Sequence, residues 1–155
     1  MNIDWSTGSK FIFLDIDGVL NSYRSAVAFD GYGSTRRPYK LDEVAVRLVK
    51  KAVEDTGSYL VISSTWRSTG TQAIASILSL YGWHFAPVVG RTGYGHKSRT
   101  GRIMKWMDEN APKAKREGRF LAIDDSELEV EKFVHVDGKV GFGIDDFRET
   151  KRLLG

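Results

Sequence analysis

The fold is best predicted from the stretch Phe11-Ile12-Phe13-Leu14-Asp15-Ile16-Asp17-Gly18-Val19-Leu20-Asn21. An apolar run precedes the aspartates, and such a run bounded by a turn signal indicates a buried strand. Strand alternation places Asp15 and Asp17 on the same side, where their carboxylates repel each other unless a cation or a proton neutralises them. Gly18 permits a tight turn and the close approach of a ligand. A plain Asp-Gly turn explains the same residues, whereas a calcium loop is disfavoured because Val19 stands where an oxygen ligand is needed.

The composition is that of an ordinary globular chain of 155 residues, which predicts a single domain over residues 1–155. The chain has no cysteine, so disulfides, thiolate nucleophiles and cysteine-zinc sites are excluded. No apolar run reaches the length of a membrane span, and the polar start is unlike a signal peptide, so we expect no membrane partner and a cytoplasmic location. The net charge is only +3, and its basic clusters can attract phosphates or nucleic acid, or simply face solvent: residues 36–40, 91–102 and 113–119.

Apolar runs alternate with helical periodicity along the chain. This alternation predicts an α/β fold in which helices cover both faces of a parallel sheet. The predicted strands are residues 10–14, 59–62, 85–89, 120–123 and 133–136, of which the third is confined to a sheet edge by Pro87. The predicted helices are residues 41–56, 71–81, 100–110 and 145–154. We expect a long loop at residues 22–40 and an exposed linker at residues 113–119.

Polar residues follow three of these strands at the point where each strand ends. In parallel sheets the carboxyl ends of the strands share one edge, and ligands bind there. The sequence therefore predicts that an aspartate pair, a hydroxyl pair and a second aspartate pair meet at this edge: Asp15 and Asp17, Ser63 and Ser64, Asp124 and Asp125.

Together and in this order, these residues resemble the haloacid dehalogenase (HAD) superfamily of phosphatases and phosphotransferases. The resemblance covers most of the chain, from Phe11 to about Asp125, and its most specific motif is Asp15-Ile16-Asp17-Gly18-Val19-Leu20. Four pieces are similar to the HAD domain of Swiss Army Knife RNA repair proteins: Leu14-Asp15-Ile16-Asp17-Gly18-Val19-Leu20-Asn21, Ser63-Ser64-Thr65-Trp66-Arg67, Arg99 ahead of Ile103-Met104-Lys105-Trp106-Met107, and Ile123-Asp124-Asp125. The resemblance implies a HAD-like Rossmannoid three-layer sandwich that is capless or carries a minimal cap at residues 22–40.

The resemblance also implies catalytic roles for the first aspartate pair. Asp15 would be the nucleophile that forms an aspartyl-phosphate. Asp17 would be the general acid that protonates the leaving oxygen, and then the general base that activates water. Its backbone carbonyl would bind the metal ion. These roles describe a Mg²⁺-dependent phosphomonoester hydrolase.

The other motifs would position and neutralise the phosphoryl group. Ser63 would donate a hydrogen bond to a phosphoryl oxygen, with Ser64 as the nearby alternative, although a helix cap explains both hydroxyls equally simply. Lys97, Arg99 and Arg102 compete as the cation of the third motif. Arg99 fits the narrower family best, and Lys97 stays an alternative because lysine is more usual across the superfamily. We expect Trp66 to be a packing residue.

The second aspartate pair completes a metal site in this interpretation. Asp124 and Asp125 would hold Mg²⁺ together with Asp15 and Asp17, since Mg²⁺ prefers hard oxygen ligands. The ion would offset negative charge as an anionic nucleophile approaches an anionic substrate. Without the family argument, the same pair is explained by helix capping.

An open site can admit a large substrate. Cations that could contact phosphates or substrate are Arg24, Arg36, Arg37 and Arg67. We therefore predict a phosphorylated substrate, which is a terminal phosphate on RNA or DNA or a smaller nucleotide. An inactive nucleic-acid or protein binding module and a phosphotransferase remain alternatives, and the oligomeric state is not predicted.

Overall fold

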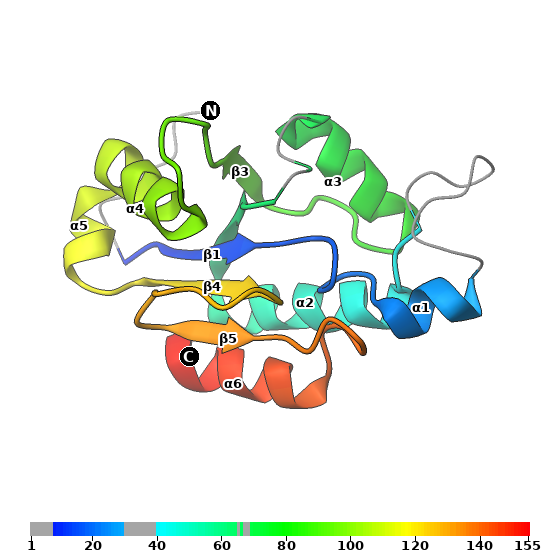
Figure 1. The fold of residues 1–155 in the computed structure, drawn as a ribbon. Helices are drawn as coiled ribbons and strands as arrows, with labels where there is room; N and C mark the ends of the chain where they lie inside the picture. The colour runs from blue at the N-terminus through cyan, green and yellow to red at the C-terminus, as the bar shows by residue number, and fades with distance from the viewer. Residues whose placement is uncertain (1–7, 30–39, 65, 67–68) are drawn as a thin grey trace.

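A parallel sheet of five strands forms the centre of the molecule in the computed structural model, which describes residues 8–29, 40–64, 66 and 69–155 (Figure 1). The strand order is β3-β2-β1-β4-β5, and all pairings are parallel. The strands are β1 (Lys10–Leu14), β2 (Ser58–Ile62), β3 (Val88–Arg91), β4 (Phe120–Asp124) and β5 (Phe133–His135). The predicted α/β fold is confirmed, and the first strand of the sequence is the central strand of the sheet.

Helices cover both faces of this sheet because alternate side chains of each buried strand point to opposite sides. On one face, Phe11 and Phe13 pack against Trp106, with ring centroids 5.5 and 5.6 Å apart. On the other face, Ile12 and Leu14 belong to the larger apolar core. The first face carries α4 (Arg99–Asn110) and α5 (Pro112–Arg116), and the second carries α2 (Glu43–Thr56), α3 (Thr71–Leu80) and α6 (Ile144–Leu154) (Figure 1).

Two predicted irregular segments contain helices, which corrects the expectations for them. Residues 22–40 begin with α1 (Tyr23–Ala28), which has too few residues to show an apolar period. Its start is fixed by Ser22 and Ser25, whose hydroxyls each accept a hydrogen bond from the other's backbone N–H. Residues 30–39 lie outside the described part of the chain. The expected linker at residues 113–119 contains most of α5, which Pro112 starts and the buried Ala114 anchors.

The third strand starts later than predicted, at Val88 rather than residue 85. Phe85 has a φ of 59° and is fully exposed, so the chain turns there before it becomes extended. β3 is an edge strand, as predicted, and Pro87 lies just before it.

Local backbone contacts fix the end of α2 and the start of α6. Gly57 ends α2 with a φ of 65°, a left-handed conformation that favours glycine. At the start of α6, an Asp146 oxygen accepts a hydrogen bond from the backbone N–H of Gly143 (2.8 Å). Within the described ranges, none of the helices has the length and apolar character needed to cross a membrane.

Candidate active site

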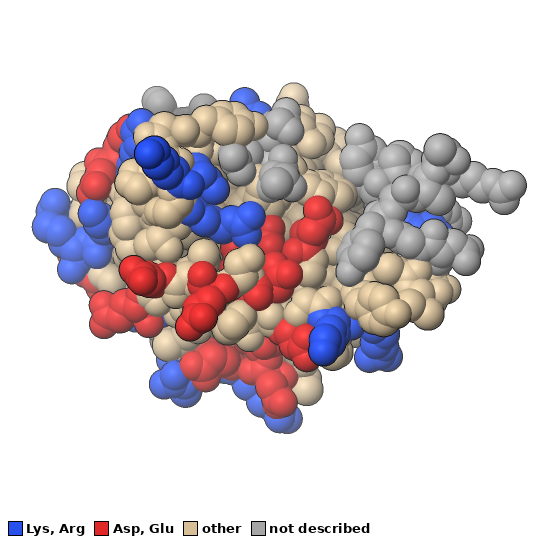
Figure 2. Space-filling view, in the orientation of Figure 1, with Lys and Arg blue, Asp and Glu red and all other residues tan. Residues whose placement is uncertain are grey.

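The register of the sheet brings the predicted strand ends together. The backbone N–H of Asp15 donates to Ile123 (3.0 Å), and that of Ser63 donates to Leu14 (2.9 Å). Asp15, Ser63 and Asp124 therefore lie side by side at the carboxyl ends of three adjacent strands. Acidic side chains gather near the middle of this face of the molecule, beside Lys and Arg side chains over the region of α4 (Figure 2).

Three carboxylates meet at this edge: those of Asp15, Asp124 and Asp125. One oxygen of each lies within 4.8 Å of the others. The side chains of Asp15 and Asp124 are buried, with exposed fractions of 4% and 1%. A cluster of hard oxygen ligands on a buried floor fits Mg²⁺, whose remaining coordination sites are usually filled by water and substrate phosphate. Of the four aspartates predicted to hold Mg²⁺, Asp15, Asp124 and Asp125 lie in this cluster, whereas Asp17 does not.

The carboxylate of Asp125 lies in a narrow space between two glycines. A Cβ atom on Gly18 would overlap the Asp125 side chain, and one on Gly138 would lie 2.9 Å from Asp125 Oδ2. Gly18 also has a φ of 87°, in the region that side chains disfavour. Gly18 is thus required both for the turn after Asp17 and for the placement of Asp125.

Arg99 is the cation that the structure brings to the carboxylates. Its Nη1 donates to both oxygens of Asp124 (2.7 and 3.0 Å) and lies 3.5 Å from Asp15 Oδ2. Lys97 is exposed in the loop before α4, where its carbonyl accepts a hydrogen bond from Arg102 (3.3 Å). Ser98 caps α4 by accepting from Gly101 N–H, so the helix begins at Arg99. Because the helix begins at Arg99, the side chain of Arg99 rather than that of Lys97 contacts the carboxylates.

Burial controls the protonation of the carboxylates. Burial first, then the charge of Asp124 and a hydrogen bond with Asp125, raise the pKa of Asp15 to about 9. Arg99 opposes this shift without cancelling it. Burial also raises the pKa of Asp124, against hydrogen bonds from the Ser126 N–H and Arg99. A site with these pKa values holds a proton at neutral pH until a further cation stabilises the ionised carboxylates.

We predict that the metal-free protein becomes less stable as the pH rises. Between the ordinary Asp pKa of 3.8 and the folded value of about 9, the folded protein keeps a proton on Asp15 that the unfolded chain releases. The free energy of unfolding should therefore fall by up to about 1.4 kcal/mol per pH unit in this window. Urea unfolding in EDTA at several pH values measures this slope. Asp15→Asn should flatten it, and equal slopes for both proteins would contradict the prediction.

Asp17 lies at the exposed rim, where two side chains orient its carboxylate. Oδ1 accepts from Asn21 Nδ2 (2.9 Å), and Oδ2 accepts from Trp66 Nε1 (3.1 Å). Asn21 is itself fixed because its Oδ1 accepts from the Gly18 N–H (2.9 Å). Trp66 packs against the core as expected, but it also has this polar contact, which a separation of 49 residues hides from sequence reasoning.

The two serines after β2 differ in their partners. The hydroxyl of Ser64 accepts from the Trp66 N–H (3.0 Å). The hydroxyl of Ser63 is buried and has no hydrogen-bond partner among the described residues. A buried hydroxyl without a partner costs free energy, so the Ser63 hydroxyl is available to a bound ligand. Thr92, at the end of β3, also has a buried hydroxyl without a partner in the described ranges, and sequence reasoning missed it.

Of the other cations predicted to contact substrate, only Arg24 lies in the described part of the chain. Arg24 lies on α1 and lines a cavity of about 450 Å³, which α1 forms with α2 and the segment before α6. None of the three clustered carboxylates lines that cavity. Arg36, Arg37 and Arg67 lie outside the described part of the chain.

Comparison with known families gives a match over most of the chain. The model of the HAD domain in Swiss Army Knife RNA repair proteins matches residues 11–147, which include the clustered carboxylates and, apart from Lys10, all five strands. No match was found among curated proteins or among solved structures.

Proposed function

Because this chain belongs to the family of HAD domains in Swiss Army Knife RNA repair proteins, we propose that it is a Mg²⁺-dependent phosphomonoesterase acting through Asp15. Membership of this family indicates a phosphatase-type hydrolase in general. The observation that carries the finer proposal is the cluster of Asp15, Asp124 and Asp125 beside Arg99, at the carboxyl edge of the sheet. This cluster would supply a nucleophile, the ligands of a metal ion and a cation for the phosphoryl group in one place.

The proposed reaction has two steps on the carboxylate of Asp15. In the first, an Asp15 oxygen attacks phosphorus, the bond from phosphorus to the leaving oxygen breaks, and Asp17 gives that oxygen its proton. In the second, Asp17 takes a proton from water, the water oxygen attacks phosphorus, and the bond to Asp15 breaks. The products are an alcohol and inorganic phosphate. Asn21 and Trp66 would hold the Asp17 carboxylate toward the leaving oxygen.

The surrounding groups would stabilise the charge of the phosphoryl group. Arg99 contacts Asp15 and Asp124 and would donate to a phosphoryl oxygen, while the Ser63 hydroxyl would donate to another. Mg²⁺ held by Asp15, Asp124 and Asp125 would offset the negative charges of nucleophile and substrate. The raised pKa of Asp15 supports this need for a cation, because the nucleophile must be ionised.

We propose terminal phosphates of nucleic acid as the substrate class. The family description names RNA repair, and Lys and Arg side chains lie beside the acidic patch (Figure 2). A basic surface next to a phosphatase site favours substrates with further phosphates.

The test is phosphate release with Mg²⁺ and with EDTA. The substrates are p-nitrophenyl phosphate, mononucleotides, and oligonucleotides that end in a 3′- or a 5′-phosphate. We expect release only with Mg²⁺, and stronger competition by a phosphate-ended oligonucleotide than by a mononucleotide. Folded, Mg²⁺-loaded protein that releases no phosphate from any of them would contradict the phosphatase proposal. Equal competition by both would contradict the preference for nucleic-acid ends.

A further inference from the structure

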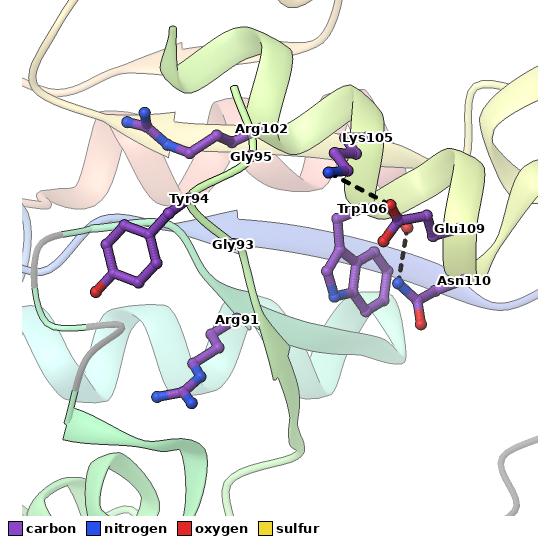
Figure 3. Close-up of a pocket in the computed structure, with 9 residues that line it drawn as sticks. All are labelled: Arg91, Gly93, Tyr94, Gly95, Arg102, Lys105, Trp106, Glu109 and Asn110. Carbon is purple, nitrogen blue, oxygen red and sulfur yellow. Dashed lines mark hydrogen bonds and ion pairs between the residues drawn. The ribbon is translucent and has the colours of Figure 1, made fainter. Parts of the chain in front are cut away.

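A second cavity, of about 330 Å³, lies between the end of β3, the glycine-rich loop that follows it and α4 (Figure 3). This volume is at the lower end of the range for small-ligand pockets, about 300–1,000 Å³. Its lining includes three cations, two aromatic rings and one acidic group: Arg91, Arg102, Lys105, Tyr94, Trp106 and Glu109. Neither Asp15 nor Arg99 lines it, so it is distinct from the carboxylate cluster.

The sheet register places this cavity next to the candidate active site. Arg91 pairs with Ile62, and Ile62 pairs with Leu14, the residue before Asp15. Two strand spacings separate these backbones, a distance of about 10 Å. Arg102 follows Arg99 by one helical turn, and it donates to the carbonyls of His96 and Lys97 in the loop between the two sites. A chain of phosphates that ends at Asp15 can therefore continue toward this cavity.

The chemistry of the walls suits a nucleotide unit. The Tyr94 ring is 70% exposed, and the side chains of Arg91, Tyr94 and Arg102 extend to the same side of the loop (Figure 3). A Cβ on Gly93 would meet nothing within 4 Å, so the backbone is open to a ligand. Lys105 and Glu109 form only a long ion pair of 3.8 Å between side chains that are more than half exposed, which leaves the lysine charge available to an anion.

We propose that this cavity binds a nucleotide of single-stranded nucleic acid next to the terminal phosphate, with a phosphodiester on Arg91 and a base stacked on Tyr94. Cations that follow the backbone, together with an exposed aromatic ring, are the means by which proteins hold single strands without reading their sequence. The proposal rests on the proposed function, because it takes the terminal phosphate to lie at Asp15. It adds a second subsite, whose residues contribute affinity for the strand rather than the chemistry of hydrolysis.

The test measures binding without turnover. All variants carry Asp15→Asn, and fluorescence anisotropy follows a labelled single-stranded hexanucleotide with a 3′-phosphate across a series of salt concentrations. We expect Tyr94→Ala to weaken binding about 5- to 100-fold, while Tyr94→Phe keeps the affinity. The logarithm of the binding constant falls linearly with the logarithm of the salt concentration, and Arg91→Ala should make this slope less steep by about 0.7. That is the contribution of one phosphate contact on a single strand. Arg148→Ala, an equal loss of charge on α6 across the sheet, should change neither quantity.

Other outcomes would overturn the proposal. If Tyr94→Ala and Arg91→Ala bind the hexanucleotide as tightly as their parent, the strand does not use this cavity. If inorganic polyphosphate or a phosphopeptide binds as tightly and is equally sensitive to Arg91→Ala, the cavity is not selective for nucleic acid. The protein with Asp15 intact is assayed in parallel on p-nitrophenyl phosphate. If that protein hydrolyses p-nitrophenyl phosphate but the variants bind the hexanucleotide as tightly as their parent, only this inference is overturned. If it is inactive but the variants lose binding as expected, only the phosphatase proposal is overturned.

Discussion

Asp15→Asn is expected to abolish phosphate release while it stabilises the metal-free protein. Asparagine has nearly the shape of aspartate but lacks the ionised oxygen that must attack phosphorus, so turnover should fall by about 10⁴-fold or more. The same change removes a buried carboxyl whose pKa is raised to about 9 by burial and by Asp124. Near pH 8 the folded wild-type protein must keep this carboxyl protonated, which costs free energy, whereas the variant has no such cost. The Tm of the variant should rise by about 2–4 °C for each kcal/mol gained in the free energy of unfolding.

Two measurements test this expectation together. Phosphate release with Mg²⁺ gives the loss of activity, and thermal unfolding in EDTA near pH 8 gives the gain in stability. Mg²⁺ should raise the Tm of the wild-type protein more than that of Asp15→Asn, because the variant lacks one of the three clustered carboxylates. Glu54→Gln, on the exposed part of α2, is the matched control and should alter neither activity on p-nitrophenyl phosphate nor the response of Tm to Mg²⁺ by a comparable amount. Substantial turnover by Asp15→Asn would show that Asp15 is not the nucleophile.

Asp17→Asn is expected to lose activity in a way that depends on the leaving group. Alkyl phosphates, including nucleotide ends, need a proton on the leaving oxygen, so their turnover should fall by about 10²- to 10⁴-fold. p-Nitrophenolate leaves without a proton, so the first step should survive with that substrate. The second step still lacks its base, so the aspartyl-phosphate should accumulate. A burst of p-nitrophenol, equal to the enzyme present and followed by slow turnover, is the expected signature in rapid-mixing experiments.

Trp66→Phe provides the graded control for Asp17. Phenylalanine keeps an aromatic ring against the core but removes the N–H that donates to Asp17 Oδ2 at 3.1 Å. Its loss of activity should be smaller than that of Asp17→Asn and larger for alkyl phosphates than for p-nitrophenyl phosphate. A uniform loss on all substrates would mean that Trp66 acts only through packing, and the absence of a burst in Asp17→Asn would argue against Asp17 as the base.

The sequence by itself determined the sheet and the meeting of its polar strand ends. Apolar runs such as residues 11–14 can only be buried, and their alternation with helical segments requires parallel connections. Parallel strands place their carboxyl ends at one edge, so Asp15, Ser63 and Asp124 had to come together there. The family followed from the same residues, because their order along the chain is specific.

Only the tertiary structure decided which of several neighbouring candidates face one another. Successive residues at a helix start point in directions about 100° apart, so the start of α4 at Arg99 brings that side chain to Asp124 while Lys97 stays exposed in the preceding loop. Ser63 and Ser64 are adjacent in the sequence, yet only Ser64 Oγ accepts from the Trp66 N–H. The bond from Trp66 to Asp17 joins residues 49 positions apart. Composition and periodicity describe the surroundings of each residue along the chain, whereas these contacts depend on side-chain directions that the packing of distant elements sets.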